Sequence, residues 1–142
     1  MKTLQQLSLF VENKPGAISA PIQALADAGV NIYTLSLADT ETFGVLRLLV
    51  RDAPAAVAVL QKAGFAPKLT DVVAIQVAHE PGSLAKVLAA LDRHQVNVEY
   101  MYAFAPGIDE KAALVFRFDD PEDALRKIGT DLPVLDAARL FA

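Results

Sequence analysis

The strongest constraint on the fold of this chain is that it repeats itself. A Pro-Gly pair follows a β-rich run at Pro15 and again at Pro81, an offset of 66 residues. Under this offset the residues on both sides of the pair agree in pattern. The matched residues are Leu7, Leu9, Val11, Ile18, Ile22, Leu25, Val30, Asn31 and Ile32 in the first copy and Val73, Ile75, Val77, Leu84, Leu88, Leu91, Val96, Asn97 and Val98 in the second. Agreement over this length predicts two copies of one supersecondary unit.

The offset changes once along the chain. From the third expected strand onward it is 68, and the residues matched by it are Leu46, Leu48 and Val50 in the first copy and Leu114, Phe116 and Phe118 in the second. We therefore expect two additional residues in the second copy, in the loop around the sequence APGIDEK.

Each copy contains the pattern strand, helix, strand, strand, helix, strand. Residues 7–11 alternate in polarity, which is typical of a half-buried strand, and the apolar spacing after the Pro-Gly pair is helical up to Gly29. The runs VNIYTLSLA and FGVLRLLVR predict the second and third strands, and APKLT predicts the last. The second helices are expected to begin at the N-cap residues Asp52 and Asp120, each followed by a proline in the first turn.

This order of elements is the ferredoxin-like arrangement of the α+β class. We predict two tandem ferredoxin-like βαββαβ units, residues 1–70 and 72–142, each an antiparallel sheet with both helices on one face. Only Asp71 separates them, so we expect the two units to have a fixed relation. Pro21 would interrupt a helix that begins at Gly16, so the first helix either kinks or begins near Ser19.

Three further segments carry expectations about exposure. Tyr100, Tyr102 and Phe104 share a strand face with Val98, so we expect them in the core beneath the helices, with the lining of an aromatic ligand as the alternative. His94 lies near a helix end and is expected to be exposed. Four acidic residues of the expected loops are scattered and predict solvated turns; they are Asp39, Glu41, Asp109 and Glu110.

The composition narrows the classes of function. The 142-residue chain has no cysteine, which excludes disulfides, thiolate catalysis and zinc–thiolate sites. Its net charge of −4 argues against nucleic acid as a partner. The longest apolar run is too short for a membrane span and the N-terminal residues do not form a signal peptide, so we expect a cytoplasmic protein that does not associate with membranes. Hydrophobic residues make up 54% of the chain, which predicts a homo-oligomer such as a dimer.

Nothing in the sequence predicts catalysis. No Ser-His-Asp set, phosphate loop or dinucleotide fingerprint is present, and the pair His79-Glu80 has no second histidine at metal-ligand spacing. We expect no catalytic residue, no metal and no cofactor, and hence no enzyme. An RNA-binding fold with the same element order is rejected, because its aromatic positions on the third strand are occupied here by Val45, Arg47 and Leu49.

The Pro-Gly corner has two interpretations. A helix N-terminus presents unpaired N–H groups that attract a carboxylate, and Gly16 and Gly82 let a ligand approach the main chain. Asn13 offers a donor and an acceptor, as a zwitterion such as a free amino acid requires. The alternative is that Pro-Gly forms a turn and Asn13 makes an Asx turn or a cap. Asn31 and Asn97 each follow a valine at a strand start, where asparagine is disfavoured, and point to a backbone bond or to a ligand contact.

The segments ENKPGAISAPIQALADAGVNI and HEPGSLAKVLAALDRHQVNV resemble the ACT domain, a small regulatory module that binds amino acids, and the resemblance covers the chain as two tandem copies. It implies a regulatory sensor that binds a small amino acid or related carboxylate between domains and modulates a partner enzyme or regulator. In that family the Asn before Pro-Gly and the Asn of G-V-N-I contact the ligand, and Asn13 and Asn31 match them. In the second copy Asn97 matches, whereas His79 and Gln95 replace the first Asn and the Gly.

The resemblance implies a set of ligand-binding residues at the two corners. They are Asn13, Lys14, Pro15, Gly16, Ala17, Ile18, Asn31 and Ile32 in the first copy and His79, Glu80, Pro81, Gly82, Ser83, Leu84, Asn97 and Val98 in the second. If the tandem pair mimics a dimer of ACT domains, Asn13 faces Asn97 and His79 faces Asn31, in two unequal pockets. His79 either contacts the ligand or caps its helix or lies in solvent. The alternative function is an oligomerisation or assembly module of the same fold that binds no ligand.

Overall fold

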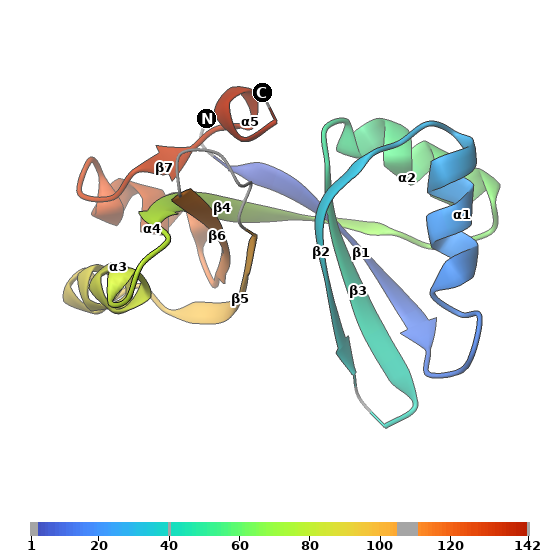
Figure 1. The fold of residues 1–142 in the computed structure, drawn as a ribbon, viewed down its shortest axis with the longest axis horizontal. Helices are drawn as coiled ribbons and strands as arrows, with labels where there is room; N and C mark the ends of the chain where they lie inside the picture. Colours follow the sequence, from blue (N-terminus) through green and yellow to red (C-terminus); the bar gives the residue numbers. More distant parts are fainter. Residues whose placement is uncertain (1–2, 40, 105–110, 142) are drawn as a thin grey trace. The chain divides into compact units, whose positions relative to one another are not determined.

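The chain forms two units (Figure 1). One unit is Gln5–Thr70, and the other is Asp71–Ala142 together with Met1–Leu4. Each unit has a hydrophobic core of its own. The structure is a computed structural model that describes residues 3–39, 41–104 and 111–141. The extra residues expected around APGIDEK lie outside the described residues, apart from Lys111, as do Asp109 and Glu110.

The first unit follows the predicted order of elements. Its elements are β1 (Leu4–Glu12), α1 (Ser19–Asp27), β2 (Ile32–Asp39), β3 (Phe43–Val50), α2 (Ala53–Lys62) and the first residues of β4 (Lys68–Ala78). β3 pairs antiparallel with both β1 and β2. β4 runs without interruption through Asp71, so APKLT does not form a separate strand as predicted.

The second unit repeats the order. Its elements are the remainder of β4, α3 (Ser83–Arg93), β5 (Val98–Phe104), β6 (Lys111–Phe118), α4 (Pro121–Ile128), β7 (Val134–Leu135) and a short helix α5 (Ala137–Leu140) that the sequence did not predict. β6 pairs with β4 and β5, and β7 pairs with β4, all antiparallel. The predicted fold, two tandem ferredoxin-like units of the α+β class with antiparallel sheets, is confirmed.

The strand registers confirm the change of offset from 66 to 68. Leu7 pairs with Leu48 in the first unit, and Val73 pairs with Phe116 in the second. Between the two units, the residue on the first strand moves by 66 positions, from Leu7 to Val73. Its partner on the third strand moves by 68 positions, from Leu48 to Phe116. The repeat is therefore structural, and any position in one unit has an identifiable equivalent in the other.

Both helices of each unit pack on the same face of its sheet (Figure 1). The buried cluster of the first unit is formed by Leu7, Leu9, Val11, Leu25, Leu46, Leu48, Val50, Ala53, Ala56 and Leu60. The cluster of the second is formed by Val73, Ile75, Val87, Leu91, Leu114, Phe116, Phe118, Ala124, Ile128 and Val134. Burial of these side chains from helices and strands alike is the main stabilising contribution to each unit.

The helix boundaries agree with the capping residues that the sequence predicts. Asp52 Oδ1 accepts a hydrogen bond from Ala55 N (3.1 Å), and Asp120 Oδ1 accepts one from Asp123 N (3.0 Å). α1 begins at Ser19, which confirms the later of the two predicted starts. Pro21 is thus the third residue of the helix, where its missing N–H removes no intrahelical bond.

Two expectations about exposure are wrong. A register shift between Val98 and Tyr100 reverses the alternation of β5, so Met101 packs against the core with Val98, and Tyr100 lies on the opposite face beside Arg117. Tyr102 and Phe104 share that opposite face. His94 is half-buried, because its Nε2 lies 2.7 Å from Asp131 Oδ2.

Candidate ligand-binding site

The Pro-Gly corner is the same tight turn in both units. Ala17 N donates to Lys14 O and Ser83 N donates to Glu80 O, at 3.3 Å in each case. The third residue of each turn is a glycine with positive φ, 86° for Gly16 and 88° for Gly82. Proline at the second position and a positive φ at the third define a type II turn, in which the third position requires glycine. Turn chemistry thus explains the Pro-Gly pair.

Each turn leads directly into a helix. Ala20 N donates to Gly16 O (3.3 Å) and Lys86 N donates to Gly82 O (3.0 Å), so the glycine carbonyl of each turn is bonded to the first turn of the helix that follows. Neither α1 nor α3, both within the described residues, has a side-chain cap; their N-cap residues are Ile18 and Gly82. The predicted alternative that Asn13 or His79 caps the helix is therefore wrong, because the turn places both residues before the cap.

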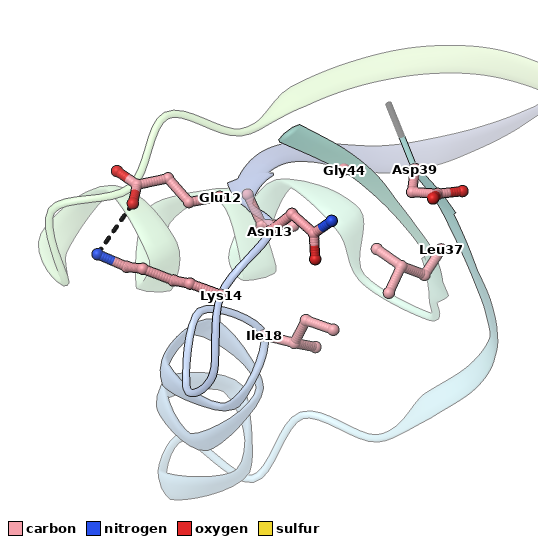
Figure 2. Close-up of a pocket in the computed structure, with 8 residues that line it drawn as sticks. Glu12, Asn13, Lys14, Ile18, Leu37, Asp39 and Gly44 are labelled. Atoms are coloured by element: carbon pink, nitrogen blue, oxygen red, sulfur yellow. Dashed lines mark ion pairs between the residues drawn. The ribbon is translucent and has the colours of Figure 1, made fainter. Parts of the chain in front are cut away.

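A hollow lies beside the first turn. It has a volume of about 60 Å³, which corresponds to roughly four to six water molecules. Its lining residues come from β1, the turn, β2 and β3; they are Val11, Glu12, Asn13, Lys14, Ile18, Leu37, Asp39 and Gly44. Figure 2 shows the Asn13 amide and the Ile18 side chain extending toward Leu37. The hollow therefore combines apolar walls with an amide and a carboxylate, as ligand sites do.

Glu12 and Lys14 form an ion pair within the lining. Lys14 Nζ lies 2.9 Å from Glu12 Oε2, on the side of the turn away from Leu37 (Figure 2). The hydrogen bond that Lys14 donates to Glu12, together with the negative charge of Glu12, raises the pKa of Lys14. Both side chains are exposed, so this ion pair contributes little to stability. The negative charge of Glu12 nevertheless balances the positive charge of the Lys14 ammonium group.

The register of the sheet explains why there is a hollow at this place. Gly44 on β3 pairs with Val11 on one side and with Asp39 on the other. A methyl group at Gly44 would lie 3.1 Å from Leu37 Cδ1 and 3.4 Å from Val11 Cγ2. Gly44 is buried, and its lack of a side chain lets the Leu37 and Val11 side chains come together over β3 as apolar walls of the hollow below the turn.

The structure brings together part of the predicted first-copy site. Asn13, Lys14 and Ile18 line the hollow, and Pro15, Gly16 and Ala17 form the turn beside it. Ile18, an apolar residue that is also among the predicted ligand-binding residues, is exposed and forms a wall of the hollow. Asn31 is exposed immediately before β2, and Ile32 packs against the core. Neither belongs to this lining.

The predicted second-copy residues also occupy equivalent places at their own corner. His79, Glu80, Pro81, Gly82, Leu84 and Asn97 are exposed, Ser83 is half-buried, and Val98 packs against the core of the second unit. His79 follows β4 as Asn13 follows β1. The pairing of Asn13 with Asn97 and of His79 with Asn31 stays a prediction.

Sequence reasoning missed five of the lining residues, namely Val11, Glu12, Leu37, Asp39 and Gly44. Asp39 was expected in a solvated turn, whereas it is the last residue of β2. Gly44 carried a usable signal, because a glycine inside a strand often marks a close approach of other atoms. Leu37 and Asp39 carried none, since their place on the wall depends on the β2–β3 register.

The second unit differs at the position of Gly44. Val77 pairs with Ala112 as Val11 pairs with Gly44, so Ala112 is the structural equivalent of Gly44. In the first unit the Leu37 and Val11 side chains lie where this methyl group would be. The two corners thus differ at this position, in addition to the replacement of Asn13 by His79.

In the part of the chain that the structure describes, no three His, Asp or Glu side chains come together as metal ligands would. The helices of the described segments are all too short or too polar to cross a membrane.

Comparison with known proteins places this fold. The family described as an ACT domain pair matches residues 2–132. A protein from Bacteroides thetaiotaomicron with a known crystal structure is 35% identical, with a TM-score of 0.90 over 99% of this chain and 96% of that one. The ligand-free regulatory subunit of aspartate kinase from Thermus thermophilus is 20% identical, with a TM-score of 0.62 over 87% of this chain and 89% of that one, a likeness of fold. The corresponding subunit from Thermus flavus is 18% identical, with a TM-score of 0.56 over 97% and 92%.

No curated protein matches the chain. The family match covers most of the sequence, and the repeat, the paired turns and the registers described above agree with it. The chain therefore belongs to the ACT family, as a pair of ACT domains.

Proposed function

We propose that this chain is a regulatory sensor that binds a small amino acid or a related carboxylate in the hollow beside the first Pro-Gly turn. The observation that carries the proposal is the lining itself, in which the Asn13 amide lies next to the start of α1. The N–H groups of a helix start and the Asn13 donor suit a carboxylate, and the Asn13 oxygen suits an ammonium group.

The size of the hollow favours a small ligand. A volume of about 60 Å³ holds the few non-hydrogen atoms of a small amino acid, and the open side leaves room for a contact from elsewhere. In the proposed arrangement Asn97 faces Asn13 and supplies this second contact to the ligand. The proposed bounds of the two ACT domains are 1–70 and 72–142. Asn31 and His79 form the second, unequal site.

Regulation would follow from differential binding. A ligand shifts a protein between two arrangements only by the difference in its affinity for them. We propose that occupancy of the hollow stabilises one arrangement of ACT domains, which a partner enzyme or regulator recognises. The likeness in fold to the regulatory subunits of aspartate kinase supports a regulatory rather than a catalytic role.

The test is a thermal-shift screen of the whole chain against the common amino acids at millimolar concentration. We expect at least one small amino acid to raise the melting temperature, since a ligand that binds only the folded state stabilises it. Asn13→Ala should remove the shift. Gln61→Ala, an exposed amide on α2 outside the lining, should retain it. If no amino acid shifts the melting temperature, the sensor function is wrong.

Exposed apolar side chains favour a second candidate, an assembly module without a ligand. Phe10 is 71% exposed and Phe43 is 50% exposed, on the neighbouring strands β1 and β3. Such residues are typical of surfaces that contact another copy. Under this alternative, Phe10→Ser lowers the mass measured by light scattering while no amino acid affects it, whereas a sensor responds to Asn13→Ala in the thermal-shift screen.

A further inference from the structure

The wall of the hollow opposite Val11 ends in a carboxylate that neither the sequence nor the family likeness assigns to a ligand. Asp39 pairs with Gly44, and Gly44 pairs with Val11, so these three residues form one row across β2, β3 and β1. All three residues line the hollow, and Gly44 at the centre of the row adds no side chain to it. A ligand in the hollow thus lies between the first turn and the end of β2 that carries Asp39.

The charges of the lining are not balanced. Among the eight described residues that line the hollow, Lys14 is the cation, and it is paired with Glu12 at 2.9 Å. Asp39 therefore remains as the unbalanced charge. A bare carboxylate in the hollow would be repelled by it, whereas a cationic group would be attracted.

We propose that Asp39 accepts the ammonium group of the ligand, and that it makes the hollow selective for α-amino acids over the 2-hydroxy acids of the same carbon skeleton. This inference rests on the proposed function, and it narrows the ligand class from carboxylates in general to zwitterions. The Asn13 amide and the start of α1 take the carboxylate end, while Asp39 takes the opposite end.

The second unit does not repeat this arrangement. Ala112 replaces Gly44, and the offset of 66 places Ala105, which lies outside the described residues, at the position of Asp39. The carboxylate belongs to the first unit alone. A chain with two Pro-Gly turns is thus expected to hold one site that selects for an ammonium group.

The experiment is isothermal titration calorimetry of the whole chain with matched pairs of ligands. The probes are glycine with glycolate, L-alanine with L-lactate and L-serine with L-glycerate. We expect at least one amino acid to bind about tenfold or more tightly than its hydroxy acid, the size of effect that one charge-assisted hydrogen bond provides. The Asp39→Asn variant should bind the amino acid more weakly. The ratio of its affinities for the amino acid and the hydroxy acid should therefore fall toward unity.

Glu41→Gln is the matched control, because it removes an exposed acidic charge from the same hairpin but not from the lining. It should leave the ratio unchanged. Equal binding of amino and hydroxy acids, or a ratio that Asp39→Asn does not alter, overturns the role of Asp39 while leaving a ligand site in place. Absence of binding by every probe overturns the proposed function together with this inference. Circular dichroism of each variant establishes that it is folded.

Discussion

Asp39 at the end of β2 is the cross-strand partner of Gly44 on β3. The pair unites a charged residue with one that has no side chain, at the place where the sheet passes below the first Pro-Gly turn. Both residues line the hollow of the first unit, and Asp39 adds a carboxylate to its rim.

Gly44→Ala should weaken amino acid binding without unfolding the protein. The added methyl group would lie 3.1 Å from Leu37 Cδ1, the end of a side chain that is exposed and free to shift. One extra methyl group in a pocket costs about 1–3 kcal/mol of binding free energy, so the dissociation constant should rise about tenfold or more. Calorimetric titration with the amino acid from the thermal-shift screen measures it.

Ala112→Gly is the converse variant in the second unit. It should leave the affinity of the first site unchanged and lower the free energy of unfolding by about 0.5–1 kcal/mol, the usual cost of glycine within a strand. If wild type and Gly44→Ala bound the amino acid with equal affinity, the assignment of the ligand to the hollow that Gly44 lines would be wrong.

Gln95→Gly should stabilise the second unit. Gln95 has a φ of 54°, in the left-handed region, and takes the position that Gly29 occupies in the first unit. The two helix ends are otherwise alike, with Val96 N bonded to Leu91 O as Val30 N is bonded to Leu25 O. Glycine relieves the backbone strain at this position, which stabilises the folded state, but its greater backbone freedom also stabilises the unfolded state. The net effect should be a rise of about 0.5–1 kcal/mol in the free energy of unfolding.

The measurement for this prediction is urea denaturation, and the matched variant is Gly29→Gln in the first unit. That change should lower the midpoint, because it introduces the strain that Gln95→Gly removes. A lower midpoint for Gln95→Gly would mean that the Gln95 side chain makes contacts that outweigh its backbone strain.

Acid should weaken α4 through Asp123. The hydrogen bond from Lys127 lowers the pKa of Asp123 below its ordinary value of 3.8, and Arg126 also pairs with this carboxylate. Because the folded state holds the lower pKa, the contribution of Asp123 is present above pH 4 and is lost as the pH falls through the folded-state pKa. Between pH 5 and pH 2.5, wild type should lose more stability in urea than Asp123→Asn does. Equal losses would show that the pairing contributes nothing.

Much of the fold was predictable because its signals are local and occur twice. The Pro-Gly turns, the caps Asp52 and Asp120 and the helical stop at Gly29 are each written in a few neighbouring residues, and repetition at a fixed offset confirmed their reading. The observed strand registers agree with the two offsets of the repeat. The fold thus depended little on contacts that a sequence leaves unspecified.

The errors arose where register decides which way a side chain faces. The shift between Val98 and Tyr100 moved Tyr100 off the core face, since one extra residue in a strand reverses every later side chain. Asp39 was missed for the same reason: its membership of the wall depends on pairing with Gly44, which is a property of two strands. Three of the eight lining residues were therefore accessible from local motifs, and five were not.

The proposed sensor function depends on the binding of a small amino acid in the hollow beside the first Pro-Gly turn. The most direct measurement is a titration of the isotopically labelled chain with the amino acid from the thermal-shift screen, followed by two-dimensional amide NMR. We expect the largest shifts at the side-chain amide of Asn13 and at the backbone amides of Gly16, Ile18 and Gly44. Saturable shifts confined to residues outside this lining, or none at all, would contradict it.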